Sequence, residues 1–213
     1  MRRLSLLLFL SAVLPAVPAA AQNSGLATGL IAGINVSTFG GADVSGLDVN
    51  ARTGLLAGIF GMVDLTSNLG LEVDVMFAQK GADFTTPAGE LAAIKTDYLQ
   101  IPALLVGRFQ VAGNAEPYVL AGPSLGFELG CEAAQATGTN TSQIIDCDEL
   151  SGSADRAGTD FGLVFGGGVR LGNVLLSLRY DLGLTQLKFA TGATDVKNRA
   201  LTLTAGLGFR VRR

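Results

Sequence analysis

The sequence predicts an all-β protein: one eight-stranded, antiparallel, up-and-down transmembrane β-barrel. Three observations support this prediction. Apolar residues alternate with polar or small residues through most of the chain, which is the period of a β-strand. The mean hydropathy is high, at +0.42, yet after residue 21 the chain has no apolar run of the ~18 residues that a transmembrane helix needs. The connections between the alternating runs are short and long in turn, as in barrels that cross a membrane.

The first 21 residues have the pattern of a secretory signal peptide. Arg2 and Arg3 give a positively charged start, and the mostly apolar run from Leu4 to Leu14 is too short to cross a bilayer. Small residues at Ala19 and Ala21 then favour cleavage before Gln22. We therefore expect residues 1–21 to be removed and residues 22–213 to form a single barrel domain outside the cytoplasm.

The strand runs can be placed in order along the chain. The short connections are Thr66–Asn68, Gln110–Glu116 and Gly172–Asn173, whereas the long ones cover about 40–52, 81–94, 130–158 and 185–197. Short turns face the periplasm in outer-membrane barrels, so both chain ends are expected there. Pro102 lies inside one run and predicts a bulge. The eight runs are 28–39, 53–65, 69–80, 95–109, 117–129, 159–171, 174–184 and 198–211.

The two faces of these runs differ in polarity. One parity is apolar, for example from Leu30 to Val36 and from Leu201 to Phe209, with Gly167 as an exception. The other parity carries polar residues and many glycines, which suits a narrow lumen. We predict that the apolar face contacts lipid, and that paired charges plug an interior just wide enough for side chains. This lumen network is expected to contain Glu72, Asp74, Arg170, Arg179, Asp181 and Arg210.

Several segments resemble a known family. They are Gln79-Lys80-Gly81, the run from Tyr98 to Pro102, and Pro117-Tyr118 followed by Gly122-Pro123. They resemble the outer-membrane β-barrel domain family, whose PorT-like or "porin family" members are small barrels of Bacteroidetes and related bacteria. The resemblance covers nearly the whole mature chain and implies an eight-stranded barrel, but it implies little about activity.

The last run resembles the C-terminal insertion signal of outer-membrane barrels. That signal is a polar residue and a glycine followed by two hydrophobic residues two positions apart, which here correspond to Thr204, Gly206, Phe209 and Val211. The chain departs from the usual pattern because it ends in Arg212-Arg213 and not on an aromatic residue. The resemblance implies that the barrel-assembly machinery is a partner during insertion.

The only two cysteines, Cys131 and Cys147, lie in the longest predicted loop. A secreted chain meets an oxidising compartment, and a disulfide closing a loop of this length contributes ~3 kcal/mol in the chain-entropy model. We therefore expect a disulfide that braces an exposed loop. A metal or catalytic thiol is not expected, since the sequence has no His and no second cysteine pair.

The composition excludes several functions. Outer-membrane barrel enzymes share mechanisms that need a histidine, and this sequence has none, so those mechanisms are excluded. The spacing of its serines, lysines and carboxylates also does not indicate a Ser-Lys or paired-carboxylate site. We expect no enzyme, no cofactor and no metal. The 15 Lys and Arg residues are outnumbered by 18 Asp and Glu residues and form no basic patch, so nucleic acid is not an expected partner.

The sequence therefore predicts a monomeric integral protein of the cell outer membrane of a Gram-negative bacterium. Its expected role is structural or adhesive, with an extracellular ligand or host surface contacted through loop 130–158 and with outer-membrane lipid around the barrel. Two alternatives remain open at this point: a narrow porin-like channel for ions or small solutes, and a soluble lipocalin-like binding barrel.

Overall fold

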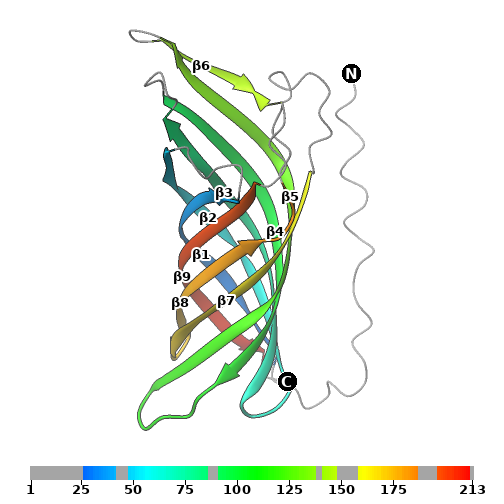
Figure 1. Cartoon of the computed structure of the whole chain (residues 1–213). Coiled ribbons are helices and arrows are strands. Elements are labelled where there is room, and N and C mark those ends of the chain that lie inside the picture. Colours follow the sequence, from blue (N-terminus) through cyan, green and yellow to red (C-terminus); the bar gives the residue numbers. More distant parts are fainter. Residues whose placement is uncertain are drawn as a thin grey trace.

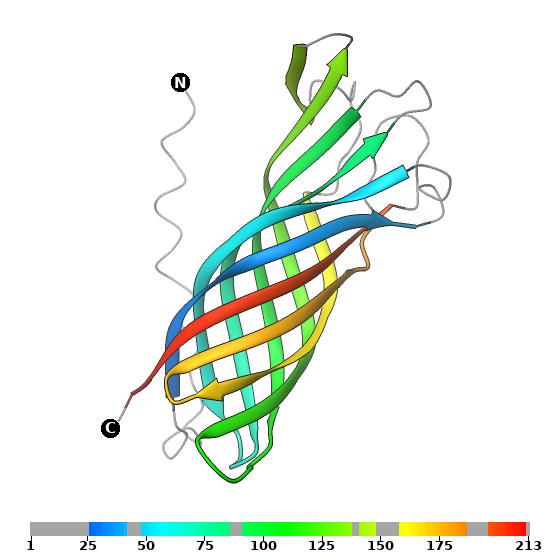
Figure 2. The ribbon, with the colours of Figure 1, turned by 90° about the vertical axis from the view of Figure 1, so that its left-hand side faces the viewer.

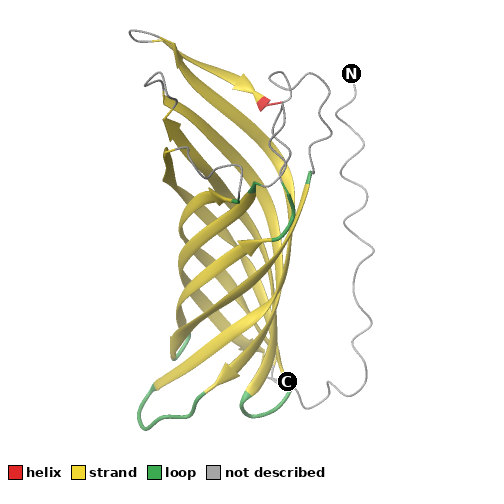
Figure 3. Cartoon of the chain, viewed as in Figure 1, coloured by secondary structure: helices red, strands yellow, loops and turns green. Residues whose placement is uncertain are grey.

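The computed structural model describes residues 26–41, 48–85, 91–137, 141–147, 158–186 and 196–211, and this part of the chain forms nine β-strands (Figure 1). The signal peptide predicted for residues 1–21 lies outside the described residues. Figure 3 shows that strands make up almost all of the described chain. No helix in this part is both long enough and apolar enough to cross a membrane. The strands are β1 Leu26–Gly40, β2 Asp48–Asp64, β3 Leu69–Thr85, β4 Leu91–Arg108, β5 Ala115–Thr137, β6 Thr141–Asp146, β7 Thr159–Leu171, β8 Val174–Gly183 and β9 Lys197–Val211.

Eight of these strands close into an antiparallel barrel, as predicted. Each barrel strand pairs with the next one along the chain, with β5 passing directly to β7. The first and last strands close the cylinder, in a register that runs from Leu26 opposite Val211 to Gly40 opposite Lys197. The topology is therefore up-and-down, and every barrel strand has a hydrogen-bonded neighbour on both sides.

Short turns gather at one end of the barrel. Residues 65–68, 109–114 and 172–173 connect strands there, and the C-terminus lies at the same end (Figure 1). Gly113 and Gly172 take positive φ values of 105° and 61°, which a glycine adopts without the steric cost of a Cβ. The β2–β3 turn is closed by the amides of Leu65 and Thr66, which donate to the Leu69 carbonyl. The three short turns are where the sequence predicted them. The connections predicted to be long at about 40–52 and 81–94 are only residues 41–47 and 86–90, because β2, β3 and β4 extend beyond the predicted runs.

The barrel is apolar outside, and most of its buried charged and polar side chains point inward. The outward side chains of Leu30, Ile59 and Leu203 are 60%, 56% and 53% exposed, while the alternate positions along each strand point inward. On β1 the outward positions from Leu26 to Val36 are apolar except for Thr28. This stretch covers about 33 Å of strand and, at a tilt of about 40°, about 25 Å of membrane. The lipocalin-like alternative is wrong, because it would place Leu30, Ile59 and Leu203 in the interior, and these side chains point outward.

The wall is taller on one side than on the other. β4 and β5, at 18 and 23 residues, continue well beyond the predicted runs 95–109 and 117–129, whereas β8 has only 10 residues. The upper part of β5 pairs with β6 in a hairpin, in register from Glu132 opposite Asp146 to Thr137 opposite Thr141. Figure 2 shows this part of the sheet rising above the rest of the barrel. The segment 130–158, predicted as a loop, is therefore partly a β-hairpin.

Pro102 does not produce the bulge that its position predicted. The β3–β4 ladder lacks pairs between Val73–Ala103 and Met76–Gln100, but the register is the same on both sides of this gap. The missing proline N–H therefore interrupts pairing without inserting a residue. The register of β4 and β5 shifts instead between Asp97 and Tyr98, at the point where the sheet leaves the barrel.

Candidate functional site: the lumen and the extracellular wall

A buried ion triad crosses the lumen. Arg179 of β8 reaches β3 on the opposite wall, where Nη1 donates to Asp74 Oδ2 at 2.5 Å and Nη2 donates to Glu72 Oε1 at 2.9 Å. The Arg179 Nε also donates to Ser177 Oγ at 3.1 Å. All three charged residues are at least 95% buried. Three of the six predicted lumen charges thus lie together, and each has a charge-assisted hydrogen bond.

Asp181 belongs to a second polar group in the upper half of the lumen. Gln100 Nε2 donates to Asp181 Oδ1 at 2.6 Å and to Ser124 Oγ at 3.2 Å. Thr202 Oγ1 donates to the other Asp181 oxygen at 3.5 Å. The partners of Asp181 therefore come from β4 and β9, and the carboxylate is held by neutral donors.

Arg170 lies at the periplasmic end, away from the triad. Its Nη1 is 3.9 Å from Glu116 Oε1, and the same carboxylate is 3.9 Å from Arg108 Nε. Arg108 makes the shorter ion pair there, at 2.6 Å to Asp64 Oδ1. The sequence analysis missed Arg108, Glu116 and Asp64, although Arg108 shares the inward parity of Gln100 and could have been found from it. The side chain of Arg210, the sixth predicted charge, lies outside the described residues.

A further group near the extracellular end was also missed. The Lys80 ammonium lies 5.6 Å from the centre of the Tyr98 ring, within cation–π distance. Asn198 Nδ2 donates to Asp160 Oδ2 at 2.9 Å and to the Tyr98 hydroxyl at 3.4 Å. These four residues are at least 93% buried. Tyr98 was considered only as part of a family-like segment, and its inward direction was not deduced.

The interior also holds apolar side chains, so the lumen is filled rather than open. In the part of the chain that the structure describes, the inward cavities between these polar groups have volumes of only about 10 Å³, which is room for about one water molecule. The predicted plug is thus made of apolar packing as well as ion pairs. Buried apolar residues fill three levels: Met62, Leu104 and Tyr118; Ile31, Phe60 and Met76; and Phe39, Ala82 and Val196.

Inward glycines let the strands curve tightly around this filling. A Cβ added at Gly166 would lie 2.2 Å from the Leu178 carbonyl oxygen. A Cβ at Gly168 would lie 2.1 Å from the Leu176 carbonyl oxygen and 2.6 Å from the Tyr118 hydroxyl. Neither position could hold a side chain without moving a neighbour. The glycine-rich inward parity therefore reflects crowding.

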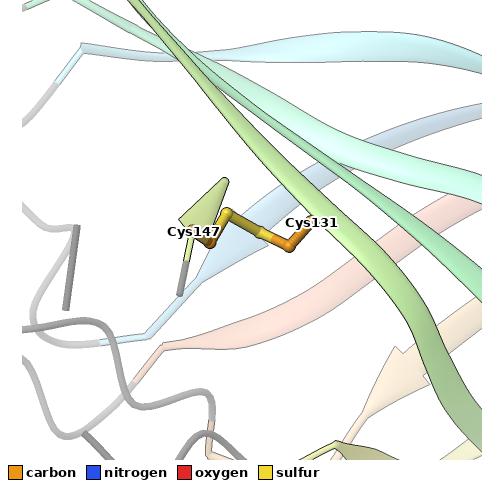
Figure 4. The surroundings of a disulfide bond; sticks show 2 residues. All are labelled: Cys131 and Cys147. Atoms are coloured by element: carbon orange, nitrogen blue, oxygen red, sulfur yellow. A yellow bond between two sulfur atoms is a disulfide. The ribbon is translucent and has the colours of Figure 1, made fainter. Parts of the chain in front are cut away.

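The predicted disulfide is present between Cys131 of β5 and Cys147, just after β6 (Figure 4). Their Cα atoms are 5.4 Å apart, and both residues are only 6% exposed. The bond ties the end of β6 back to β5, so it fixes the base of the hairpin that rises above the barrel.

The four residues of the predicted insertion signal lie on the last strand. Thr204 points inward and shares a hydrogen bond of 2.5 Å with Ser177, and Gly206 is also inward. Phe209 points outward and is 56% exposed, while Val211 pairs with Leu26. The role of this segment in insertion stays a prediction.

Comparisons with solved structures find small outer-membrane barrels. Crystal structures of OprG from Pseudomonas aeruginosa, the neisserial surface protein NspA and Ail from Yersinia pestis align with TM-scores of 0.50, 0.47 and 0.46. OprG is 14% identical to this chain, and the alignment covers 89% of this chain and 96% of OprG. NspA is 17% identical, with 87% of this chain and 99% of NspA covered. Ail is 16% identical, with 86% of this chain and 98% of Ail covered. At 14% identity the likeness to OprG shows the fold alone. A search of the curated proteins found no match.

The family assignment comes from the sequence itself. The family described as "Outer membrane protein beta-barrel domain" matches residues 20–188, which is most of the chain. Its description agrees with the closed eight-stranded barrel and the apolar outer face. The protein is an integral outer-membrane β-barrel, and the chain belongs to the outer membrane protein beta-barrel domain family.

Proposed function

We propose that the protein is a plugged surface barrel whose extracellular wall binds an external ligand or host surface. The observation that supports this most is the filled lumen. The Arg179 triad and the apolar layers occupy the described interior, and the cavities between its polar groups have volumes of only about 10 Å³. The elongated β4–β5 wall and the β5–β6 hairpin then offer the largest structured extracellular surface in the described residues. The barrel acts as a monomer, is inserted by the barrel-assembly machinery, and has no enzymatic activity.

The extracellular wall has the properties of a stable display element. The β5–β6 hairpin is pinned by the disulfide at its base, and an ion pair of 3.5 Å between Lys95 and Glu132 links β4 to β5 just below it. Ile144 on β6 is 71% exposed, which leaves an apolar side chain available to a partner. A rigid element loses little conformational entropy on binding, so a braced hairpin is better suited to binding than a free loop.

The plugged lumen predicts that the purified protein does not conduct. In planar bilayers we expect no current steps above background, because filled interiors do not hold a continuous column of water. An open outer-membrane porin measured under the same conditions is the positive control. Regular current steps that scale with protein concentration would favour the porin-like channel instead.

The binding role predicts that the hairpin is needed for attachment. Cells that display the intact protein should adhere to cultured epithelial cells more than cells that lack it. Replacing residues 132–157 with a short turn should abolish this gain, while the barrel still reaches the surface in equal amount. As a matched control, a two-residue insertion in the periplasmic turn 109–114 should leave adhesion unchanged. Equal adhesion with and without the hairpin would contradict the proposal.

A further inference from the structure

The disulfide closes a hairpin that is local in the sequence. Glu132 of β5 lies opposite Asp146 of β6, so Cys131 and Cys147 occupy the next opposed positions beyond that pair. All six register pairs of the hairpin lie between the two cysteines. Because the hairpin uses only residues 131–147, its ladder and its cross-link can form before any barrel strand has found its partner.

The folded barrel shields both cysteines. Each is only 6% exposed. Cys131 is the register partner of Thr96 on β4, which shares the inward parity of Tyr98 and is 3% exposed. The cross-link therefore lies on the inner face of the extracellular wall. A protein that makes disulfides must bring its own sulfur atom against a cysteine sulfur, and this burial prevents that contact.

The folded hairpin also stands on the far side of the outer membrane from such proteins. β5 and β6 rise above the barrel at the end opposite the short periplasmic turns (Figure 2). Catalysed disulfide formation in Gram-negative bacteria takes place in the periplasm. A barrel inserted with two free thiols would hold them outside the cell, where no periplasmic protein could oxidise them.

We propose that the disulfide between Cys131 and Cys147 is made in the periplasm, before the barrel is inserted. The oxidant is a periplasmic thiol oxidase, a protein whose own reactive disulfide accepts the electrons. The β5–β6 hairpin then crosses the outer membrane already closed. This inference rests on the outer-membrane location of the barrel, not on the proposed binding role of the hairpin.

The reaction is a transfer of two electrons in two exchanges. One cysteine thiolate attacks a sulfur of the oxidase disulfide, which forms a mixed disulfide and releases the second oxidase sulfur as a thiolate. The other cysteine thiolate then attacks the sulfur of the first cysteine, which forms the hairpin disulfide and expels the remaining oxidase sulfur. The two protons lost by the cysteines end on the oxidase, which leaves as a dithiol.

The first test compares oxidation of the folded and unfolded protein. The full chain without its predicted signal peptide is kept reduced, and one sample is folded into detergent micelles while another stays in urea. Purified thiol oxidase is added, and free thiols are counted with a maleimide after acid quenching. We expect the unfolded chain to be oxidised at least about tenfold faster, because the folded wall must first open locally.

Two controls accompany this comparison. A short dithiol peptide measured in both solutions corrects for effects of urea and detergent on the oxidase. The change in gel migration on heating shows that the reduced barrel is folded. Equal oxidation rates of the folded and unfolded chain would overturn the proposal.

The second test follows the order of events in cells by pulse–chase labelling. Extracts are run on gels without heating, which separates folded from unfolded chains, and the free thiols of each band are then counted. We expect the disulfide to appear first in chains that are still unfolded, and to be absent in cells that lack the oxidase. The variant C131A/C147A gives the folding time of a chain that cannot form it. Folded barrel with two free thiols that are oxidised later, or equal oxidation without the oxidase, would contradict the proposed order.

Discussion

Replacing Arg179 by Met is expected to prevent the barrel from folding stably. Arg179 neutralises two carboxylates, Glu72 and Asp74, which are only 3% and 0% exposed. Removing the guanidinium leaves both charges buried without a partner, and breaking a buried ion pair in this way costs about 3–5 kcal/mol. Urea titration of the barrel in detergent micelles, followed by the gel shift between folded and heat-unfolded forms, would measure the loss.

The same site offers a rescue that separates charge from shape. In R179M/E72M/D74L all three charges are replaced by apolar side chains of similar size. Because no charge is then stranded, stability should return to within about 1 kcal/mol of the native protein or exceed it. R170Q is the matched control. The Arg170 guanidinium is 3.9 Å from Glu116, whose side chain is 32% exposed, so this substitution strands no buried carboxylate and should cost much less than R179M. If R179M alone were as stable as R170Q, the triad would not be the structural centre of the plug.

Replacing Leu30 by Arg is expected to produce the second largest loss. Leu30 is 60% exposed and lies near the middle of the apolar stretch of β1 between Leu26 and Val36. A charged side chain on the lipid face at the bilayer midplane costs about 2–4 kcal/mol. Unfolding of the variant from phosphatidylcholine vesicles in guanidinium would report this cost as a lower transition midpoint.

Depth provides the internal control for this experiment. Val36 is outward on the same strand and 41% exposed, but it lies at the upper edge of the belt. Val36→Arg should cost only about 0–1 kcal/mol, because the guanidinium reaches the headgroups. Equal costs at the two positions would mean that the membrane is centred elsewhere along β1.

Local residue patterns were enough to predict the barrel. The alternation of apolar and polar residues identified eight strands, and it also gave the correct inward or outward direction for Glu72, Asp74, Arg179 and Asp181. Period-two alternation carries this information because a strand places successive side chains on opposite faces. The same pattern could not give the partners of a residue, since Arg179 meets Glu72 across 107 positions of sequence.

Strand ends were harder to predict than strand identity. β4 and β5 continue above the membrane, and there the outward residues include Lys95, Asp97 and Glu132, so the apolar signal that marked the strands stops. The β5–β6 hairpin is held by backbone pairing and by the disulfide, neither of which needs apolar alternation. Sequence analysis therefore assigned this segment to a loop.

By itself, the sequence determined which side chains face lipid and which face the lumen, because that choice depends only on strand periodicity and the cost of a charge in hydrocarbon. It also determined that Cys131 and Cys147 are the one available disulfide pair. Only the tertiary structure decided how the lumen is filled. Arg179 pairs with the carboxylates of β3, whereas Asp181 accepts hydrogen bonds from β4 and β9. Arg170 lies near Glu116. The physical reason is that ring closure and strand stagger set the height of each inward side chain, and ion pairs form only between groups that meet at the same height.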